Sequence, residues 1–197
     1  MESLFVFLSL IGLSFTAFCG VKIDSLLARK IKMMFIEDQR WRIELNSLQS
    51  GKGGKFDEAT IEKNMGKTDD QNLVEAKRII AKYGFPGHSL VGEDCSDKFW
   101  AIVQHCDDDV PFQKKVLLLM ANEVKKHNAA GDNYALLQDR VLANQHKKQI
   151  YGTQVRVDPK THRAKPLPIQ DSLHVDARRK AVGLPPLKDY LKSFEKH

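Results

Sequence analysis

The chain has 197 residues, of which 42% are hydrophobic and 28% are charged, and its formal net charge is +6. This length and composition fit one compact domain with a substantial hydrophobic core, preceded by an export segment. Lys and Arg are dispersed and no aromatic residues interleave with them, which argues against a base-stacking nucleic-acid surface.

Residues 1–19 have the pattern of a secretory signal peptide. Leu4 to Phe18 is an apolar run shorter than the ~20 residues needed to cross a bilayer, and small residues stand at Ala17 and Cys19. We therefore expect an exported protein, periplasmic or secreted, cleaved after Cys19. A lipid anchor at Cys19 and an uncleaved signal anchor are the alternatives.

The next segment, Ser25 to Leu48, predicts an amphipathic helix because its apolar residues recur every three or four positions. Asp38 falls on this apolar stripe where a leucine would be expected, and Arg42 lies one turn further. Either Arg42 neutralises the carboxylate within the helix, or the carboxylate turns into a polar pocket, since a buried unpaired charge is too costly.

The rest of the chain predicts more helices and one late β-hairpin. Residues 50–67 contain four glycines and predict a mobile loop, after which Thr68 is expected to cap a helix. Further elements are helices at 96–106, 111–126 and 134–143, strands at 149–157 and 162–169, and helices at 171–181 and 186–194. The predicted fold class is mainly α: one compact helical domain, residues 20–197, of about five to seven helices with a late β-hairpin.

Two cysteines remain after the export segment. Cys95 and Cys106 stand at the two ends of one predicted helix, whose length is roughly 16 Å. A disulfide needs Cα atoms within ~7 Å. We expect two reduced, semi-buried thiols and no cysteine nucleophile.

A polar corner is predicted between two helices, at residues 105–109. Asp108 or Asp109 has the position of a cap for the following helix. Histidine exchanges protons near neutral pH, so His105 is a candidate general base, with Asp107 or Asp139 as the carboxylate that orients it. A divalent metal at this corner is a weaker alternative, because no second histidine lies at ligand spacing. We expect no metal and no cofactor.

A second group of candidates lies on the predicted strand at 149–157. One face of this strand would carry three polar residues and the other face a fourth: Gln149, Tyr151 and Thr153, then Gln154. Such a face could recognise a polar ligand, and a solvated edge strand is the alternative. On the preceding helix, Arg140 could hold an anionic ligand group or pair with Asp107.

Several of these residues also form short motifs. They are Asp38-Gln39-x-x-Arg42, Gln104-His105-x-Asp107, Asp139-Arg140-Val141 and Gln149-x-Tyr151-Gly152-Thr153-Gln154. In this order they resemble domain-of-unknown-function family 6624, an uncharacterised and mostly bacterial family, over about Glu37 to Leu191. The resemblance implies one domain and draws attention to the motif residues, but the family has no assigned activity.

The C-terminal third concentrates the positive charge. Residues 140–197 hold 13 Lys and Arg against 5 Asp and Glu, a net charge of +8, while the residues before them sum to −2. This distribution favours a small polar or anionic ligand, or an anionic envelope surface, as partner; solvation of amphipathic helices is the alternative. Nucleic acid is disfavoured.

Two functional classes follow. The first is an exported ligand-binding or interaction module, in which Asp38, Arg42, His105, Asp139, Arg140 and the strand at 149–154 converge in one polar cleft. The alternative is a cell-envelope hydrolase or lyase that uses His105 as general base. The sequence contains no nucleophile elbow, zinc-protease spacing or phosphate-binding glycine loop, and this favours the binding module.

Overall fold

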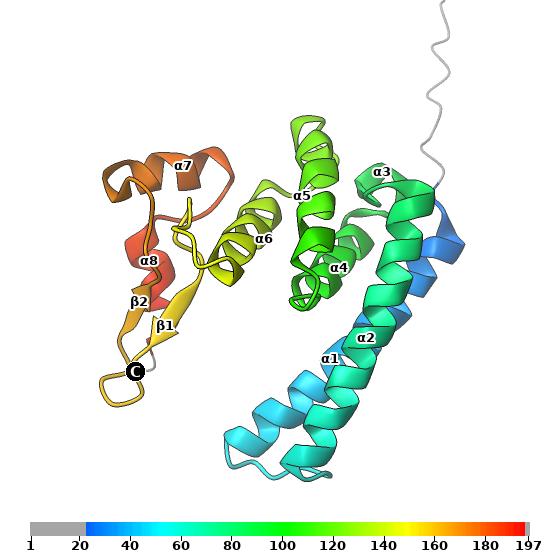
Figure 1. The fold of residues 1–197 in the computed structure, drawn as a ribbon, viewed down its shortest axis with the longest axis horizontal. Helices are drawn as coiled ribbons and strands as arrows, with labels where there is room; N and C mark the ends of the chain where they lie inside the picture. Colours follow the sequence, from blue (N-terminus) through cyan, green and yellow to red (C-terminus); the bar gives the residue numbers. More distant parts are fainter. Residues whose placement is uncertain (1–22, 196–197) are drawn as a thin grey trace, which may run out of the picture.

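The computed structural model describes residues 23–195, and the predicted signal peptide lies outside them. Figure 1 shows a mainly helical chain, as the sequence predicted. Within the described residues the helices are α1 (Ser25–Gln49), α2 (Glu58–Tyr83), α3 (His88–Val91), α4 (Glu93–Gln104), α5 (Val110–Lys125), α6 (Gly131–Asn144), α7 (Val175–Ala181) and α8 (Leu187–Lys192), with a 3-10 turn at Ser172–His174. The strands are β1 (Val155–Val157) and β2 (Ala164–Pro166). No helix in this range is long and apolar enough to span a bilayer.

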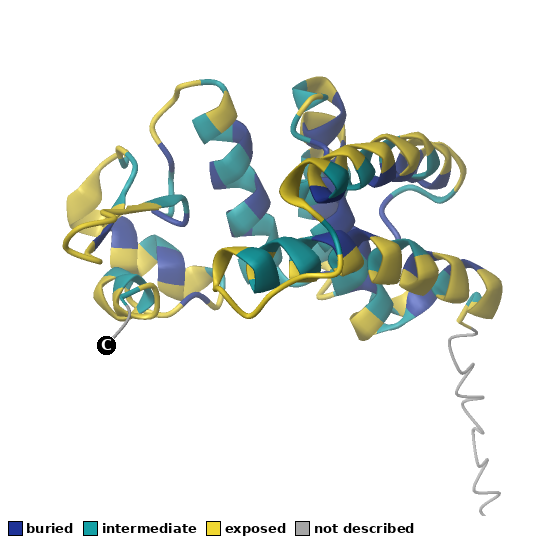
Figure 2. Ribbon diagram, turned by 90° about the horizontal axis from the view of Figure 1, so that it is seen from below, coloured by how far each residue is buried: buried dark blue, intermediate teal, exposed yellow. Residues whose placement is uncertain are grey.

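The helices pack in chain order around an apolar core. α1 and α2 form a long hairpin, α4 packs against both, and α5 and α6 lead from there to a C-terminal lobe (Figure 1). Buried residues lie where the helices face one another, and the outer faces are exposed (Figure 2). The core includes Ile31, Ile80, Phe99, Val116 and Leu137. α1 and α2 both contact α4.

The start of α2 differs from the prediction. Residues 58–67 are helical, so the predicted loop is wrong there, and Thr68 lies inside the helix, where its Oγ1 donates to the carbonyl of Asn64. The true cap is Asp57, whose carboxylate accepts from the N–H of Thr60 at 2.7 Å. Ile61 is fully buried, and this packing outweighs the roughly 1 kcal/mol that a glycine such as Gly66 costs inside a helix.

The β-hairpin is confirmed but is shorter than predicted. β1 and β2 are antiparallel, with Val155 opposite Pro166, Arg156 opposite Lys165, and Val157 opposite Ala164. Residues 149–154 are not part of the strand, so the prediction that Gln149, Tyr151 and Thr153 share a strand face is wrong.

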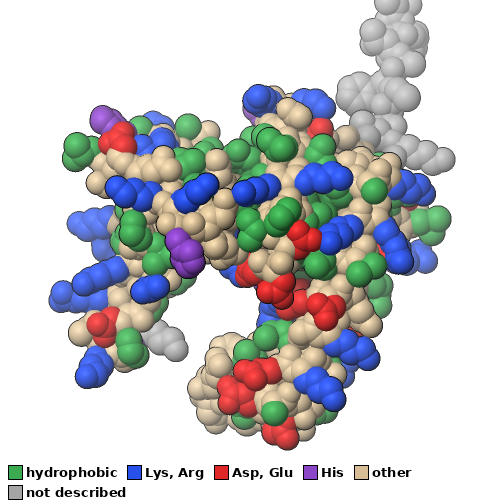
Figure 3. Space-filling model, in the orientation of Figure 1, with side chains coloured by type: hydrophobic (Ala, Val, Ile, Leu, Met, Phe, Trp, Pro, Cys, Tyr) green, Lys and Arg blue, Asp and Glu red, His purple; other side chains and the backbone are tan. Residues whose placement is uncertain are grey.

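The molecule has a hollowed surface. In Figure 3 a broad hollow separates the C-terminal lobe from the α1–α2 hairpin, and acidic side chains gather along its α1–α2 side. The corner between α4 and α5 lies at the inner end of this hollow (Figures 1 and 3). This corner carries His105.

Candidate functional site

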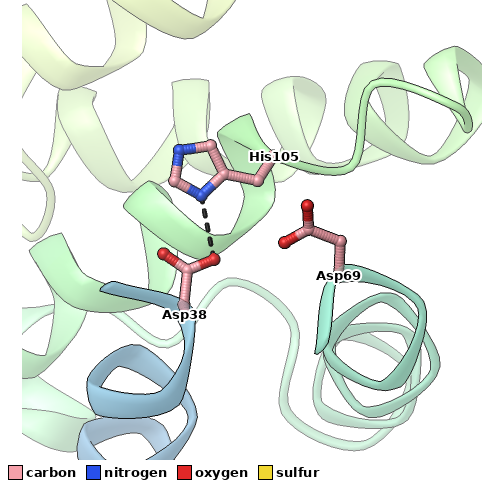
Figure 4. Close-up of side chains that lie close together, drawn as sticks. All are labelled: Asp38, Asp69 and His105. Carbon is pink, nitrogen blue, oxygen red and sulfur yellow. Dashed lines mark hydrogen bonds and ion pairs between the residues drawn. The ribbon is translucent and has the colours of Figure 1, made fainter. Parts of the chain in front are cut away.

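The centre of the site is a histidine that faces a buried carboxylate. His105 directly follows α4, and its Nδ1 lies 2.9 Å from Oδ1 of Asp38 on α1 (Figure 4). The Asp38 side chain is fully buried, whereas 23% of the His105 side chain is exposed. A carboxylate only accepts hydrogen bonds, so this contact fits a proton on Nδ1, and in a neutral ring with that tautomer Nε2 is the acceptor. Among residues 23–195, no hydrogen bond occupies Nε2.

Neighbouring donors balance the buried charge of Asp38. Arg42 Nη1 lies 3.1 Å from Oδ1 and also donates to the Asp38 carbonyl at 3.0 Å. Gln39 Nε2 donates to Oδ2 at 2.7 Å. Arg42 thus pairs with Asp38 within the helix, which is one of the two alternatives drawn from the sequence, and the carboxylate also contacts His105 at the end of α4. This set of donors makes the buried carboxylate tolerable.

A second carboxylate holds Arg42 in place. Arg42 Nη2 lies 2.9 and 3.0 Å from the two carboxylate oxygens of Asp69, in the middle of α2. Burial raises the pKa of Asp69, and the hydrogen bond from Arg42 acts against this effect. A chain of contacts thus runs from Asp69 through Arg42 and Asp38 to His105. Sequence reasoning missed Asp69, because only the pairing of α1 with α2 brings it to Arg42.

Two carboxylates and one imidazole of this chain of contacts have the composition of a metal site. Asp38, Asp69 and His105 each offer one ligand atom, and these atoms lie within 4.8 Å of one another. However, the guanidinium of Arg42 already bridges the two carboxylates. A divalent cation would lie against this fixed positive charge, which opposes metal binding at this group.

The neighbouring cysteine is not equipped to act as a nucleophile. Cys106 is buried, and its thiol donates to the carbonyl of Ile102 at 3.5 Å. Burial, reinforced by the surrounding carboxylates, raises its pKa to about 12, so the thiolate is scarce near neutral pH. Cys95 is also a free thiol, as the helix spacing predicted.

A second polar group fixes the corner next to His105. Arg140 on α6 donates to both oxygens of Asp107, through Nε at 2.8 Å and Nη2 at 2.5 Å. Asn144 and Gln113 donate to Oδ1 of the same carboxylate, at 2.8 and 3.2 Å. Burial by itself would raise the pKa of Asp107, but these hydrogen bonds hold it below its usual value. Of the two roles considered for Arg140, the structure contains the pairing with Asp107. Asp109 caps α5 through a 2.9 Å bond from the N–H of Phe112.

The third group is built around Asp139, which is fully buried on α6. Its carboxylate accepts from the backbone N–H groups of Ile150, Tyr151 and Thr153 at 2.7, 3.1 and 2.9 Å. It also accepts from the Thr153 hydroxyl at 3.0 Å. These bonds take the backbone donors that a strand would use in a sheet, which explains why the segment 149–154 folds as a loop.

The other side chains of this loop are engaged in similar contacts. Gln149 is fully buried, donates to the carbonyls of Gln154 and Leu167 at 3.0 and 2.8 Å, and accepts from the Gln154 N–H at 2.8 Å. Two side chains of the C-terminal helices also reach this loop. Arg179 donates to the carbonyl of Tyr151 at 2.7 Å, and the hydroxyl of Tyr190 donates to the carbonyl of Thr153 at 3.1 Å. The polar residues of the loop therefore join α6 to the C-terminal lobe.

The predicted site residues thus fall into three groups. Asp38, Arg42 and His105 lie together, Asp107 and Arg140 lie together, and Asp139 lies with the loop at 149–154. Within residues 23–195, no hydrogen bond or ion pair joins Asp139 or this loop to the Asp38–His105 pair. In that pair, Nε2 of His105 has no hydrogen-bond partner among the described residues.

Comparison with known proteins agrees with the motifs. A model described as "Family of unknown function (DUF6624)" matches residues 28–197. The chain belongs to the DUF6624 family. No curated protein and no solved structure matches it. The family model matches more of the chain than the motifs did, which covered about Glu37 to Leu191. The Asp38–His105 pair, the Asp107–Arg140 pair and the Asp139 group all lie inside the matched region.

Proposed function

We propose that this DUF6624 protein is an enzyme in which His105 transfers protons and Asp38 orients it. One observation carries the proposal: Nδ1 of His105 bonds to a fully buried carboxylate while Nε2 has no partner among the described residues. An orienting carboxylate fixes the tautomer of a catalytic imidazole and stabilises the imidazolium that forms during the reaction.

A second histidine–aspartate pair, which is exposed, shows by contrast why burial matters for orienting the imidazole. His174 Nδ1 lies 2.8 Å from Oδ2 of Asp171, but both side chains are exposed, at 72% and 54%. Water competes for those groups, so the contact orients the imidazole weakly. The Asp38–His105 pair is protected, and its carboxylate is held by Arg42 from one side, which preorganises the imidazole.

The proposed chemistry is acid–base transfer without a covalent intermediate. Nε2 of His105 removes a proton from a water molecule or from the substrate, and the resulting imidazolium returns a proton to the leaving group. Activation of water gives hydrolysis, and removal of a substrate proton gives elimination, so the reaction class is hydrolase or lyase. The buried Cys106 thiol, with its raised pKa, supports a mechanism that uses no cysteine. An amide or glycoside of the cell envelope is the substrate expected for an exported protein.

A ligand-binding module is the second candidate. Arg42, Asp107 and Arg140 each have a protein partner, so in such a module they would hold the site in shape while His105 contacts the ligand. In this case Nε2 of His105 would accept a hydrogen bond from the ligand, and no product would form.

The test compares wild type with His105→Gln and with His174→Gln as a matched control. Each protein is incubated with cell-envelope fragments, and products are analysed by mass spectrometry. Glutamine retains hydrogen bonding but cannot take up a proton near neutral pH, so His105→Gln should lower turnover by about 10²–10⁴-fold. His174→Gln should keep wild-type turnover.

Ligand binding by calorimetry separates the two candidates. Wild-type binding without product for every fragment supports the module. Equal product from wild type and His105→Gln rules out His105 as the proton-transferring group.

A further inference from the structure

The β-hairpin carries three cations on one face. Antiparallel pairing places Arg156 directly opposite Lys165, and alternation along the strand places Arg163 on the same face as Lys165. All three side chains are exposed. The opposite face of the hairpin contains the buried Ala164 and turns toward the lobe. Figure 3 shows Lys and Arg gathered over this part of the surface.

This arrangement is unfavourable for the hairpin itself. Like charges directly opposite each other on neighbouring strands destabilise a sheet. Within residues 23–195, none of the three cations has an ion-pair partner. The fold therefore holds three positive charges together that its own acidic groups do not neutralise.

The one carboxylate on this face, Asp158, accepts hydrogen bonds from the backbone of the turn. The Asp158 N–H donates to the carbonyl of Arg163, which places Asp158 opposite Arg163. Its Oδ1 accepts from the backbone N–H groups of Lys160 and Thr161 at 2.8 and 2.9 Å, and these bonds lower its pKa. Asp158 thus closes the turn, and the face keeps a net charge of about +2 from three cations and one anion.

The three cations also line a hollow. A depression of about 470 Å³ is lined by Arg156, Asp158, Arg163 and Lys165, together with the apolar residues Val157, Pro159, Pro166, Leu167 and Pro168. The fixed φ of proline restricts the backbone there.

We propose that the outer face of the β-hairpin, Arg156, Arg163 and Lys165, is a binding site for a phosphoryl group. A phosphate monoester carries a charge of about −1.5 to −2 and three terminal oxygens, which matches three convergent cations with a net charge of about +2. Arginine recognises such oxygens with two parallel hydrogen bonds, and lysine adds a mobile point charge. This site is separate from the Asp38–His105 pair and does not depend on the function proposed for it.

Two probes distinguish the sources of such a group. Inorganic phosphate is titrated into the labelled protein while the backbone amides of residues 155–166 are followed by NMR. Separately, the protein is sedimented with phosphatidylcholine vesicles that contain or lack phosphatidic acid. Shifts with inorganic phosphate alone assign the site to a soluble phosphorylated ligand, and sedimentation only with phosphatidic acid assigns it to a lipid headgroup.

The decisive comparison is between two triple variants of equal charge. Arg156→Gln, Arg163→Gln and Lys165→Gln together should weaken binding at least about tenfold, because three charge-assisted contacts are lost. The control changes Lys147, Lys148 and Lys180 to Gln; all three are exposed and lie in the same C-terminal third. It should weaken binding by less than about twofold, since it removes only long-range attraction. Equal losses in the two variants, or no binding of either probe by wild type, overturn the proposal.

A single substitution tests whether a loss of phosphate binding could result from unfolding of the hairpin. Lys165→Glu replaces the like-charge pair with an opposite-charge pair, so the hairpin should melt no earlier than in wild type. Phosphate binding should nevertheless be lost. A variant that melts normally and binds like wild type also overturns the proposal.

Discussion

Asp38 and His105 are 67 residues apart in the chain, and their side chains meet at 2.9 Å because the middle of α1 packs against the end of α4. Arg42 adds a second contact to the same carboxylate and connects it to Asp69. The pair is therefore supported by three elements, and its stability should depend on Arg42 as much as on the two residues themselves.

Arg42→Met should lower the free energy of unfolding by about 2–4 kcal/mol, because it leaves the buried Asp38 and the half-buried Asp69 without their cation. Asp38→Asn in the same background should cost less than it does alone, with a coupling energy of about 0.5–3 kcal/mol. Arg40→Met is the control on the same helix. Arg40 is 52% exposed, and its loss should change stability by less than about 1 kcal/mol. Additive effects of the two site substitutions in urea denaturation would contradict the coupling.

The sequence identified Asp38 because it interrupts an otherwise regular apolar stripe, and a charge at such a position needs a partner. It did not identify Asp69, which lies on the helix α2 beside Thr68 and Asn72 and breaks no comparable stripe. The contact with Arg42 spans 27 residues and depends on how α1 and α2 are aligned. The apolar pattern and the residue spacing of each helix do not predict how α1 and α2 are aligned with each other.

The errors in the fold have related causes. Glycines between residues 50 and 67 predicted a loop, but burial of Ile61 and the cap at Asp57 extend α2 through much of it. Alternation at 149–154 predicted a strand, but the carboxylate of Asp139 takes the backbone donors of that segment. In both places a tertiary contact overrides a local preference, whereas the other long helices follow their apolar periodicity closely.

The core of α5 provides a direct test of the packing. Met120 is 1% exposed and Leu118 is 74% exposed on the same helix. Met120→Ala should lower the free energy of unfolding by about 2–5 kcal/mol, because it removes buried methylenes and leaves a cavity. Leu118→Ala should change it by less than about 0.5 kcal/mol. Thermal and urea denaturation of both variants measure this difference, and similar losses would mean that the outer face of α5 is covered in solution.

Asp139 should act as the anchor of the loop at 149–154. Asp139→Ala leaves the N–H groups of Ile150, Tyr151 and Thr153 without their acceptor, so the free energy of unfolding should fall by about 3–5 kcal/mol. Amide hydrogen exchange at these three positions should also accelerate more than in the rest of the chain.

The neighbouring substitution Gln138→Ala is the control for this loop, because Gln138 is half-buried on the same helix. It should leave the exchange of all three amides near wild type. Unchanged exchange in Asp139→Ala would show that the loop is held by Gln149 and the C-terminal helices instead.

The last prediction concerns acid. The hydrogen bonds from Arg140, Asn144 and Gln113 outweigh burial and lower the pKa of Asp107 from its ordinary value of 3.8. A carboxyl group whose pKa is lower in the folded state stabilises the fold above the pKa of the unfolded chain, and that contribution is lost as the pH falls through the folded-state pKa. Asp107→Asn should therefore be less stable than wild type at pH 7, and the difference should shrink below a pH of about 3.8.

Urea denaturation across this pH range measures the difference in the free energy of unfolding. The exposed neighbour Asp108→Asn is the control, and it should change stability at pH 7 by less than about 0.5 kcal/mol. A difference between Asp107→Asn and wild type that stays constant with pH would mean that Asp107 fixes the α4–α5 corner through its shape and not through its charge.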